Sequence, residues 1–300
     1  MRPSLFSCRR AGRPPLLKGE QSVSFTIHTQ GDLVWLTAPV LENRPGMVHG
    51  FSTRKGGVSG PPWDTLNLGV GRGDRMENIL ENYRRFCGVI GASERRSVLS
   101  RQVHGTAVRV CTEADAGKGL YAERDFLADG LVTNVPDLPL AVFSADCGIL
   151  LLYDPETASI GAVHAGWRGC AAGIVEEAVL VMGREYGAKP ENILAAVGPS
   201  IGRCCFETDG DVPEAMRAAL GGDAEPYLEI RGPKYHVDLA GLNRQWLLKA
   251  GVLPAHIDSS GLCTACRTDL FWSYRRMGDA RGAQTAMISL VSGGQEGRRP

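Results

Sequence analysis

Three residues of types that bind metal ions lie at or just beyond apolar runs of the chain. His104 lies in the segment RQVHG, Cys147 lies in SADC, and His164 lies in HAGWRG. Zinc accepts imidazole and thiolate ligands, and three protein ligands leave a fourth position for water or substrate. The three residues are far apart in the sequence and form no local signature. Spacing alone therefore leaves an alternative open, in which a histidine is buried with a hydrogen-bond partner and the cysteine thiol is inert.

Two charged residues accompany these candidate ligands. Arg168 follows His164 in a glycine-containing turn before a helical pattern. A helix N-terminus attracts anions, and a guanidinium suits phosphate or carboxylate. Asp146 interrupts a strongly apolar stretch, where a carboxylate is costly to bury without a partner. The alternative for both is structural: a solvated arginine and an aspartate that caps a loop.

The elements that must position these residues alternate between strand-like and helical patterns. Short apolar runs predict strands at Leu33–Leu36, Met47–Ser52, Ala107–Val110, Leu131–Thr133, Leu138–Phe143, Ile149–Tyr153, Ser159–Val163, Ile193–Val197 and Ala286–Val291, and Val98-Leu99 is also strand-like. Helical periodicity predicts helices at Met76–Ile90, Cys170–Tyr186, Val212–Leu220 and Leu239–Ala250. Asp211 and Asp238 are candidate N-caps, and Gly187 and Gly251 are candidate helix ends. This order favours an α+β fold with mixed sheets over a strictly alternating parallel one.

Composition and charge are those of an ordinary globular protein. The 300 residues are 43% hydrophobic and 22% charged, and 33 basic residues balance 33 acidic ones. That balance gives no argument for nucleic-acid or membrane binding. Nine cysteines without the spacing of a small disulfide-rich domain indicate reduced thiols in a cytoplasmic protein. We expect a basic, disordered extension over residues 1–29, a single catalytic domain over 30–292 and a disordered tail over 293–300.

Ten motifs, in order, resemble those of the laccase-domain family, also called the peptidoglycan editing factor family. They are FSTRKGGVS, LNLG, RQVHG, DGLVTN, SADC, HAGWRG, AVGPSIGRCCFE, HVDL, CTAC and FWSYRR, which span about Gly50 to Val291. The resemblance implies mixed sheets and helices in a layered sandwich, similar to the fold of a cytotoxic-necrotizing-factor-like cysteine hydrolase. It also implies that His104, Cys147 and His164 hold zinc.

The resemblance implies a reaction as well. Members of the family cleave adenosine, inosine and methylthioadenosine with phosphate, releasing the base and a sugar 1-phosphate, and deaminate adenosine as a side activity. Arg168 and Arg54 are then candidates for phosphate, and Asn67 for a ribose hydroxyl or the base. Asp146 is a candidate general acid/base or a partner that orients a ligand histidine. We expect a monomer whose partners are purine nucleosides and phosphate.

Two departures from the family pattern and one further motif bear on the site. Gly148 follows ADC where many members have Leu-Pro, and Ala283 follows Gly282 where an arginine is common. The CTAC motif, Cys263 to Cys266, has no second CxxC to complete a four-cysteine zinc site. We expect it to be structural.

Three other functions stay open. One is copper-dependent polyphenol oxidation, to which adventitious copper could contribute. The second is a cysteine hydrolase with Cys147 as nucleophile and His164 as base. The third is a binding module that merely retains a metal.

Overall fold

The computed structural model describes residues 25–292, and within them fifteen strands form three sheets. The first sheet has the order β1 (Thr26–Gln30), β2 (Leu33–Thr37), β3 (Met47–Ser52), β15 (Gln284–Leu290), β7 (Leu140–Ser144) and β4 (Val98–Leu99). The second has the order β14 (Ile257–Ser259), β10 (Leu194–Val197), β8 (Gly148–Asp154), β9 (Ser159–Ala165), β6 (Gly130–Thr133) and β5 (Val108–Val110). A small third sheet has the order β11 (Glu207–Thr208), β13 (Lys234–Val237) and β12 (Leu228–Arg231).

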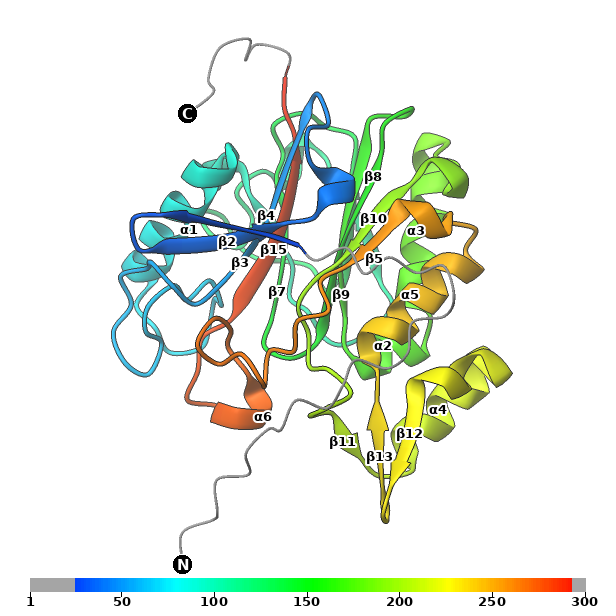
Figure 1. Cartoon of the computed structure of the whole chain (residues 1–300). Coiled ribbons are helices and arrows are strands. Elements are labelled where there is room, and N and C mark those ends of the chain that lie inside the picture. The colour runs from blue at the N-terminus through cyan, green and yellow to red at the C-terminus, as the bar shows by residue number, and fades with distance from the viewer. Residues whose placement is uncertain (1–24, 293–300) are drawn as a thin grey trace, which may run out of the picture.

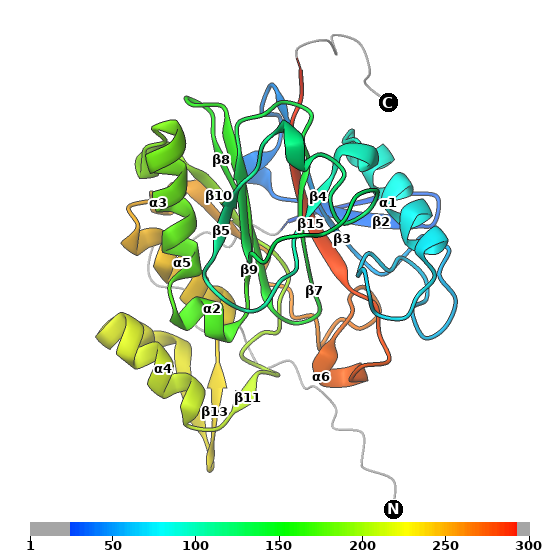
Figure 2. The same ribbon diagram turned by 180° about the vertical axis from the view of Figure 1, so that it is seen from behind.

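The two large sheets pack face to face between layers of helices. One core cluster joins residues of both sheets, and two others join each sheet to its helices. Helix α1 (Met76–Ile90) covers the outer face of the first sheet, and α3 (Ile174–Tyr186) and α5 (Leu239–Lys249) cover that of the second (Figures 1 and 2). The remaining helices are α2 (Trp167–Ala171), α4 (Asp211–Leu220) and α6 (Tyr274–Met277).

Strand β8 shows why the central strands are apolar without interruption. Successive side chains of a strand point to opposite faces of the sheet. Leu150 and Leu152 accordingly pack against the helical layer, whereas Ile149 and Leu151 pack against the first sheet. Both faces are covered, so both sets of side chains must be apolar.

The predicted α+β class with mixed sheets is confirmed, and every predicted strand is present with small shifts at the ends. Strands β1, β11, β12, β13 and β14 were not predicted. Most of these are short or carry exposed, charged residues, which leaves little hydrophobic periodicity to find. The likeness to the toxin fold stays a prediction.

The predicted helix Cys170–Tyr186 is wrong as a single element. The chain forms α2 and α3 instead, because Gly173 between them has a positive φ of 80° and ends the first helix. Asp238 caps α5 by accepting a hydrogen bond from the Gly241 N–H, as predicted. Asp211 is not an N-cap but the first residue of α4, after Gly210.

Ordered structure begins earlier than residue 30. Strand β1 starts at Thr26, inside the range predicted to be a disordered extension, and pairs with β2 from Thr26–Thr37 to Gln30–Leu33. The rest of that extension and the tail over 293–300 lie outside the described residues. Among the helices of the described range, none has the length and apolar character needed to cross a bilayer.

Candidate metal centre

The structure brings together the three predicted ligand residues, His104, Cys147 and His164. Their ligand atoms all lie within 4.8 Å of one another. The Cys147 Sγ is 3.7 Å from His104 Nε2, and the two imidazole rings meet edge to face with centroids 4.9 Å apart. His164 is buried, Cys147 is half-buried and His104 is exposed, so the cluster opens toward solvent on one side.

The ligands are placed where the two large sheets meet. The segment that carries Cys147 crosses from β7 in the first sheet to β8 in the second, and His164 lies near the end of β9 beside it. Ile149 at the start of β8 pairs with His164 in register. The loop that carries His104 is tied to β7 because the Gln102 amide exchanges two hydrogen bonds with the Phe143 backbone, of 2.7 and 2.9 Å.

Asp129 organises two of the ligands, and it was not identified as a site residue from the sequence. Its carboxylate lies 2.8 Å from His164 Nδ1 and accepts hydrogen bonds from the backbone N–H groups of Val103, His104 and Gly105. A carboxylate on Nδ1 fixes the ring and leaves Nε2 for a metal. The sequence does contain a signal for this role. Asp129 is the first residue of the DGLVTN motif, and its carboxylate directly precedes a strand that is buried throughout.

The electrostatics of the cluster favour a thiolate. Burial alone raises the pKa of Cys147, but the neighbouring His164 and His104 outweigh burial and lower it to about 6. Burial alone lowers the pKa of His164, but Cys147 and Asp129 outweigh burial and raise it to about 9. Because the thiolate is the metal-binding form of cysteine, Cys147 is ready to bind a cation at neutral pH, whereas His164 must release a proton before it can bind one.

Gly166 allows the ligands to approach the backbone. A Cβ atom there would lie 2.8 Å from His104 Cδ2 and 3.0 Å from Cys147 Sγ. The absence of a side chain, the two imidazoles, the thiolate and the oriented His164 ring together fit a tetrahedral metal ion with one open position.

Asp146, predicted as a general acid/base or as a partner of a ligand histidine, makes its hydrogen bonds to other residues. Its carboxylate accepts hydrogen bonds from the Thr264 hydroxyl (2.6 Å), the Ser273 hydroxyl (3.0 Å) and the Arg275 N–H (2.7 Å). Its φ is 94°, so these contacts hold a left-handed backbone next to Cys147. These contacts do not include His104 or His164; the carboxylate that contacts His164 is that of Asp129.

Arg168 is exposed, and its guanidinium stacks on Trp167 at 4.2 Å. Within residues 25–292, no hydrogen bond or ion pair involves this guanidinium, which leaves its donors available to an anion. The helix that follows is only five residues long, because α2 ends at Ala171. Two anion-binding features are expected in this segment, a helix N-terminus and a guanidinium. Because α2 is so short, only the Arg168 side chain remains.

The other two predicted site residues are built into a loop instead. Arg54 donates to the carbonyls of Asp64 and Thr268 and stacks on Trp272 at 4.0 Å. Asn67 is fully buried, and its amide oxygen accepts from the N–H groups of Gly69 and Ala283. None of these contacts directs the Arg54 or Asn67 side chain toward the His–Cys–His cluster.

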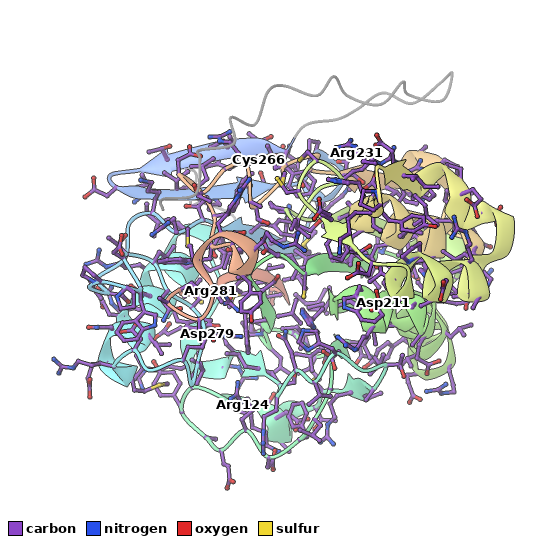
Figure 3. All side chains as sticks on the ribbon, turned by 90° about the horizontal axis from the view of Figure 1, so that it is seen from below. Arg124, Asp211, Arg231, Cys266, Asp279 and Arg281 are labelled. Carbon is purple, nitrogen blue, oxygen red and sulfur yellow. The ribbon has the colours of Figure 1, made fainter. Side chains whose placement is uncertain are left out.

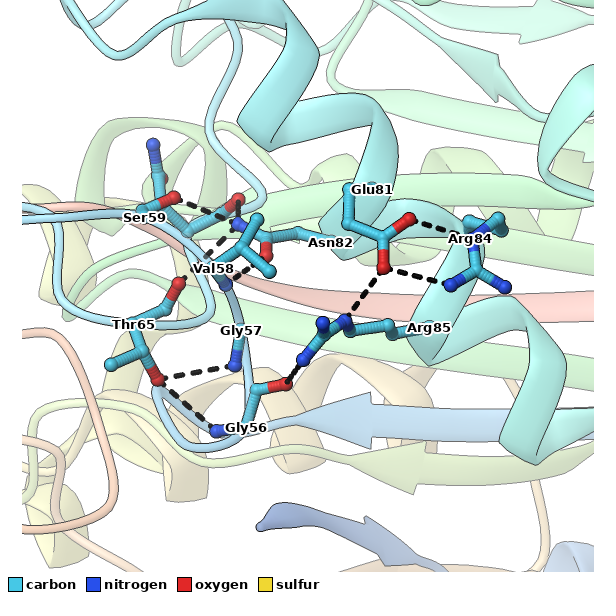
Figure 4. Close-up of polar contacts among 10 residues, drawn as sticks. Gly56, Gly57, Val58, Ser59, Thr65, Glu81, Asn82, Arg84 and Arg85 are labelled. Carbon is cyan, nitrogen blue, oxygen red and sulfur yellow. Dashed lines mark hydrogen bonds and ion pairs between the residues drawn. The ribbon is translucent and has the colours of Figure 1, made fainter.

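Helix α1 anchors the same loop (Figure 4). Asn82 accepts from the Val58 N–H and donates to Ser59, and Arg85 donates to the Gly56 carbonyl. The Thr65 hydroxyl oxygen accepts the N–H groups of Gly56 and Gly57. The glycines and polar residues of this motif thus have structural partners.

Arg281 is a second cation near the cluster, and the sequence did not single it out. It is 6% exposed, its guanidinium lies 5.1 Å from the Tyr274 ring, and its Nε has no partner among the described residues. Burial first, and then Arg72, lower its pKa to about 10, against the attraction of Asp146 and Cys147. Figure 3 labels Arg281 on the lower face of the molecule. It precedes Gly282, whereas the family arginine is expected after that glycine.

Comparison with known proteins agrees with this architecture. A family model described as "Multi-copper polyphenol oxidoreductase laccase" matches residues 48–291. Purine nucleoside phosphorylase YlmD of Geobacillus stearothermophilus is 35% identical over 257 residues, which are 84% of this chain and 92% of that protein. Purine nucleoside phosphorylase YfiH of Escherichia coli K12 is 37% identical over 256 residues, 85% and 99% of the two chains.

Solved structures share the fold. The crystal structure of YlmD from Geobacillus stearothermophilus superposes with a TM-score of 0.81 at 33% identity, over 89% of this chain and 99% of that one. The crystal structure of the hypothetical protein YfiH of Bacillus licheniformis gives 0.82 at 30% identity, over 88% and 98%. The chain belongs to this laccase-domain family.

Proposed function

We propose that this protein is a zinc-dependent purine nucleoside phosphorylase that acts on adenosine, inosine and methylthioadenosine. The observation that carries the proposal is the cluster of His104, Cys147 and His164, ordered by Asp129 and open on one side. The printed names of the relatives support the reaction class. The products are the free base and ribose 1-phosphate, or its methylthio analogue.

The residues of the site have distinct roles in this reaction. His104, Cys147 and His164 hold the zinc ion, which supplies Lewis acidity when bound. Phosphate is an anion, and its attack on an electron-poor ribose carbon requires cations that bind and orient it. Arg168, whose guanidinium is exposed, and Arg281, whose Nε is buried without a partner, are the cations we assign to phosphate. Arg54, Asn67 and an acid/base role of Asp146 are not part of the proposal.

Deamination of adenosine is a side activity at the same site. Lewis-acid zinc sites in other enzymes activate water for attack on the ring carbon that bears the amino group. The half-open cluster leaves one side for such a substrate.

A cysteine hydrolase is the second candidate, because Cys147, His164 and Asp129 also form a thiol, imidazole and carboxylate chain. His104 favours the metal over this alternative, since a second imidazole beside the thiolate adds a metal ligand but is not required for a nucleophile and base.

Substitution at the ligands and at the two cations tests these roles. His164→Ala should lose both zinc and turnover. Arg168→Ala and Arg281→Lys should keep zinc but raise the KM for phosphate by about 10- to 100-fold, since a charge-assisted hydrogen bond is worth roughly 1.5–3 kcal/mol. The measurements are elemental analysis and initial rates at varied phosphate concentration.

Arg184→Ala is the matched control, because Arg184 is an exposed arginine on α3 that pairs with Glu185. It should change neither quantity. Loss of zinc from the Arg168→Ala protein, or an unchanged KM for phosphate in both arginine variants, would contradict the assignment.

A further inference from the structure

Four cysteines meet in a second cluster that the proposed reaction does not use. Cys204, Cys205, Cys263 and Cys266 have all four sulfur atoms within 4.8 Å of one another. The Cys266 Sγ is 3.4 Å from the sulfurs of both Cys204 and Cys205, well beyond the disulfide bond length of about 2.05 Å. The sequence has no second CxxC motif, but the adjacent pair Cys204-Cys205 supplies the two further cysteines in space.

The sheet explains why these two pairs meet. Strands β10 and β14 run parallel, so their following loops leave the second sheet at the same edge. An isolated parallel β-bridge between the backbones of Ser200 and Cys263 holds the two loops side by side. The Gly202 N–H donates to the Cys263 sulfur at 3.2 Å, and a Cβ on Gly202 would lie only 3.2 Å from the Cys263 Cβ.

The spacing and surroundings of the sulfurs suit a tetrahedral thiolate site. A zinc–sulfur distance of about 2.3 Å places tetrahedral sulfurs about 3.8 Å apart, close to the spacing here. Four thiolates around a divalent ion leave excess negative charge, and Arg276 Nη2 lies 3.5 Å from the Cys205 sulfur. Arg275 donates to the carbonyls of Cys205 and Glu207. Backbone and guanidinium donors to thiolates are the outer contacts that such a site requires.

We propose that Cys204, Cys205, Cys263 and Cys266 bind a second, structural zinc ion. All four positions are occupied by protein ligands, as in structural sites, so this ion takes no part in the reaction. Soft thiolates select zinc over the hard divalent cations magnesium and calcium.

The second ion would position the first site. Thr264, inside the CTAC motif, donates its hydroxyl to Asp146, and the Ile201 N–H donates to the Asp146 carbonyl. Arg275 completes the link, because its own N–H binds the Asp146 carboxylate. Both cysteine loops and α6 therefore hold the residue before the ligand Cys147. Figure 3 looks onto this side, where Cys266 is labelled.

The proposal is tested by the metal stoichiometry of the full chain. The protein is purified under reducing conditions with zinc and then desalted. The wild-type protein should contain two zinc ions per chain. His104→Ala/Cys147→Ala and Cys263→Ser/Cys266→Ser should each contain one. Cys111→Ala, which alters a buried cysteine outside both clusters, is the control and should keep two. One zinc ion in the wild type that is lost only from the His104/Cys147 variant would overturn the proposal.

X-ray absorption at the zinc edge gives a readout that does not depend on folding of the Cys263→Ser/Cys266→Ser protein. In the His104→Ala/Cys147→Ala protein, the remaining zinc should have four sulfur neighbours at about 2.3 Å. Nitrogen or oxygen neighbours, no bound zinc, or a mass two hydrogens lower that shows a disulfide among the four cysteines would contradict a zinc tetrathiolate. None of these readouts requires nucleoside turnover, so they are independent of the proposed reaction.

Discussion

At the scale of single residues, the site depends on the Asp129 carboxylate, which contacts two members of the His–Cys–His cluster. Asp129 binds His164 Nδ1 and three successive backbone N–H groups of the loop that carries His104. One side chain thus orients the ring of one candidate ligand and holds the backbone of another. His104 itself has a φ of 61°, a conformation that an ordinary side chain adopts only when its surroundings hold it there.

Asp129→Asn should therefore weaken zinc binding with little effect on the fold. An amide cannot supply two acceptor oxygens, so both ligands lose part of their orientation. Removal of such an outer partner usually costs about 10- to 100-fold in metal affinity. Competition with a chromophoric chelator measures that affinity.

Asp125→Asn is the control, since Asp125 is an exposed aspartate that pairs with Lys118. It should leave zinc affinity unchanged. Equal affinity in the Asp129→Asn and wild-type proteins would show that Asp129 does not orient the ligands.

At the scale of elements, the apolar strands and the three residues of the His–Cys–His cluster could be predicted from the sequence, and their partners could not. Strands β7, β8 and β9 are buried on both faces, and their long apolar runs identify them. Strand β14 is three residues long and pairs in parallel with β10, so no local sequence pattern predicts it. The same unpredicted pairing brings Cys204 and Cys205 to the CTAC motif. Arg54 and Asn67 have motif character, but their buried contacts appear only in three dimensions.

Strand β3 contains a buried histidine that makes stability depend on pH. His49 accepts the Ala38 N–H on Nε2 at 2.9 Å, and burial, despite the nearby Glu42, lowers its pKa from 6.5 to about 4. Above pH 6.5 the imidazole is neutral in both the folded and unfolded states. As the pH falls toward 4, the unfolded state binds a proton that the folded state does not, so stability decreases.

The free energy of unfolding should therefore fall by about 2 kcal/mol through His49 between pH 7 and pH 5, at 1.36 kcal/mol per pH unit below the unfolded pKa. His49→Gln keeps an acceptor for the Ala38 N–H and should remove this part of the pH dependence. Urea unfolding at the two pH values measures it. His256→Gln, at a half-buried histidine outside β3, is the control. A pH dependence in His49→Gln equal to that of the wild type would refute the assignment.

At the scale of the whole molecule, the site exists because two sheets share one boundary. His104 follows β4 and Cys147 follows β7, both in the first sheet, whereas His164 lies on β9 in the second. The face-to-face packing of the sheets converts a wide separation in sequence into a cluster within 4.8 Å. The cysteine cluster lies at the same side of the second sheet and reaches the first cluster through Asp146. Both proposed metal sites thus depend on one packing arrangement.

The most direct test of the central claim is a product assay with control of the metal. The purified protein is incubated with inosine and phosphate, and ribose 1-phosphate is measured before chelation, after chelation and after addition of zinc. We expect ribose 1-phosphate to form, to disappear on chelation and to return with zinc. Activity that survives removal of the metal but is abolished by alkylation of Cys147 would contradict the claim and favour a cysteine hydrolase, and no turnover of inosine, adenosine or methylthioadenosine would contradict it outright.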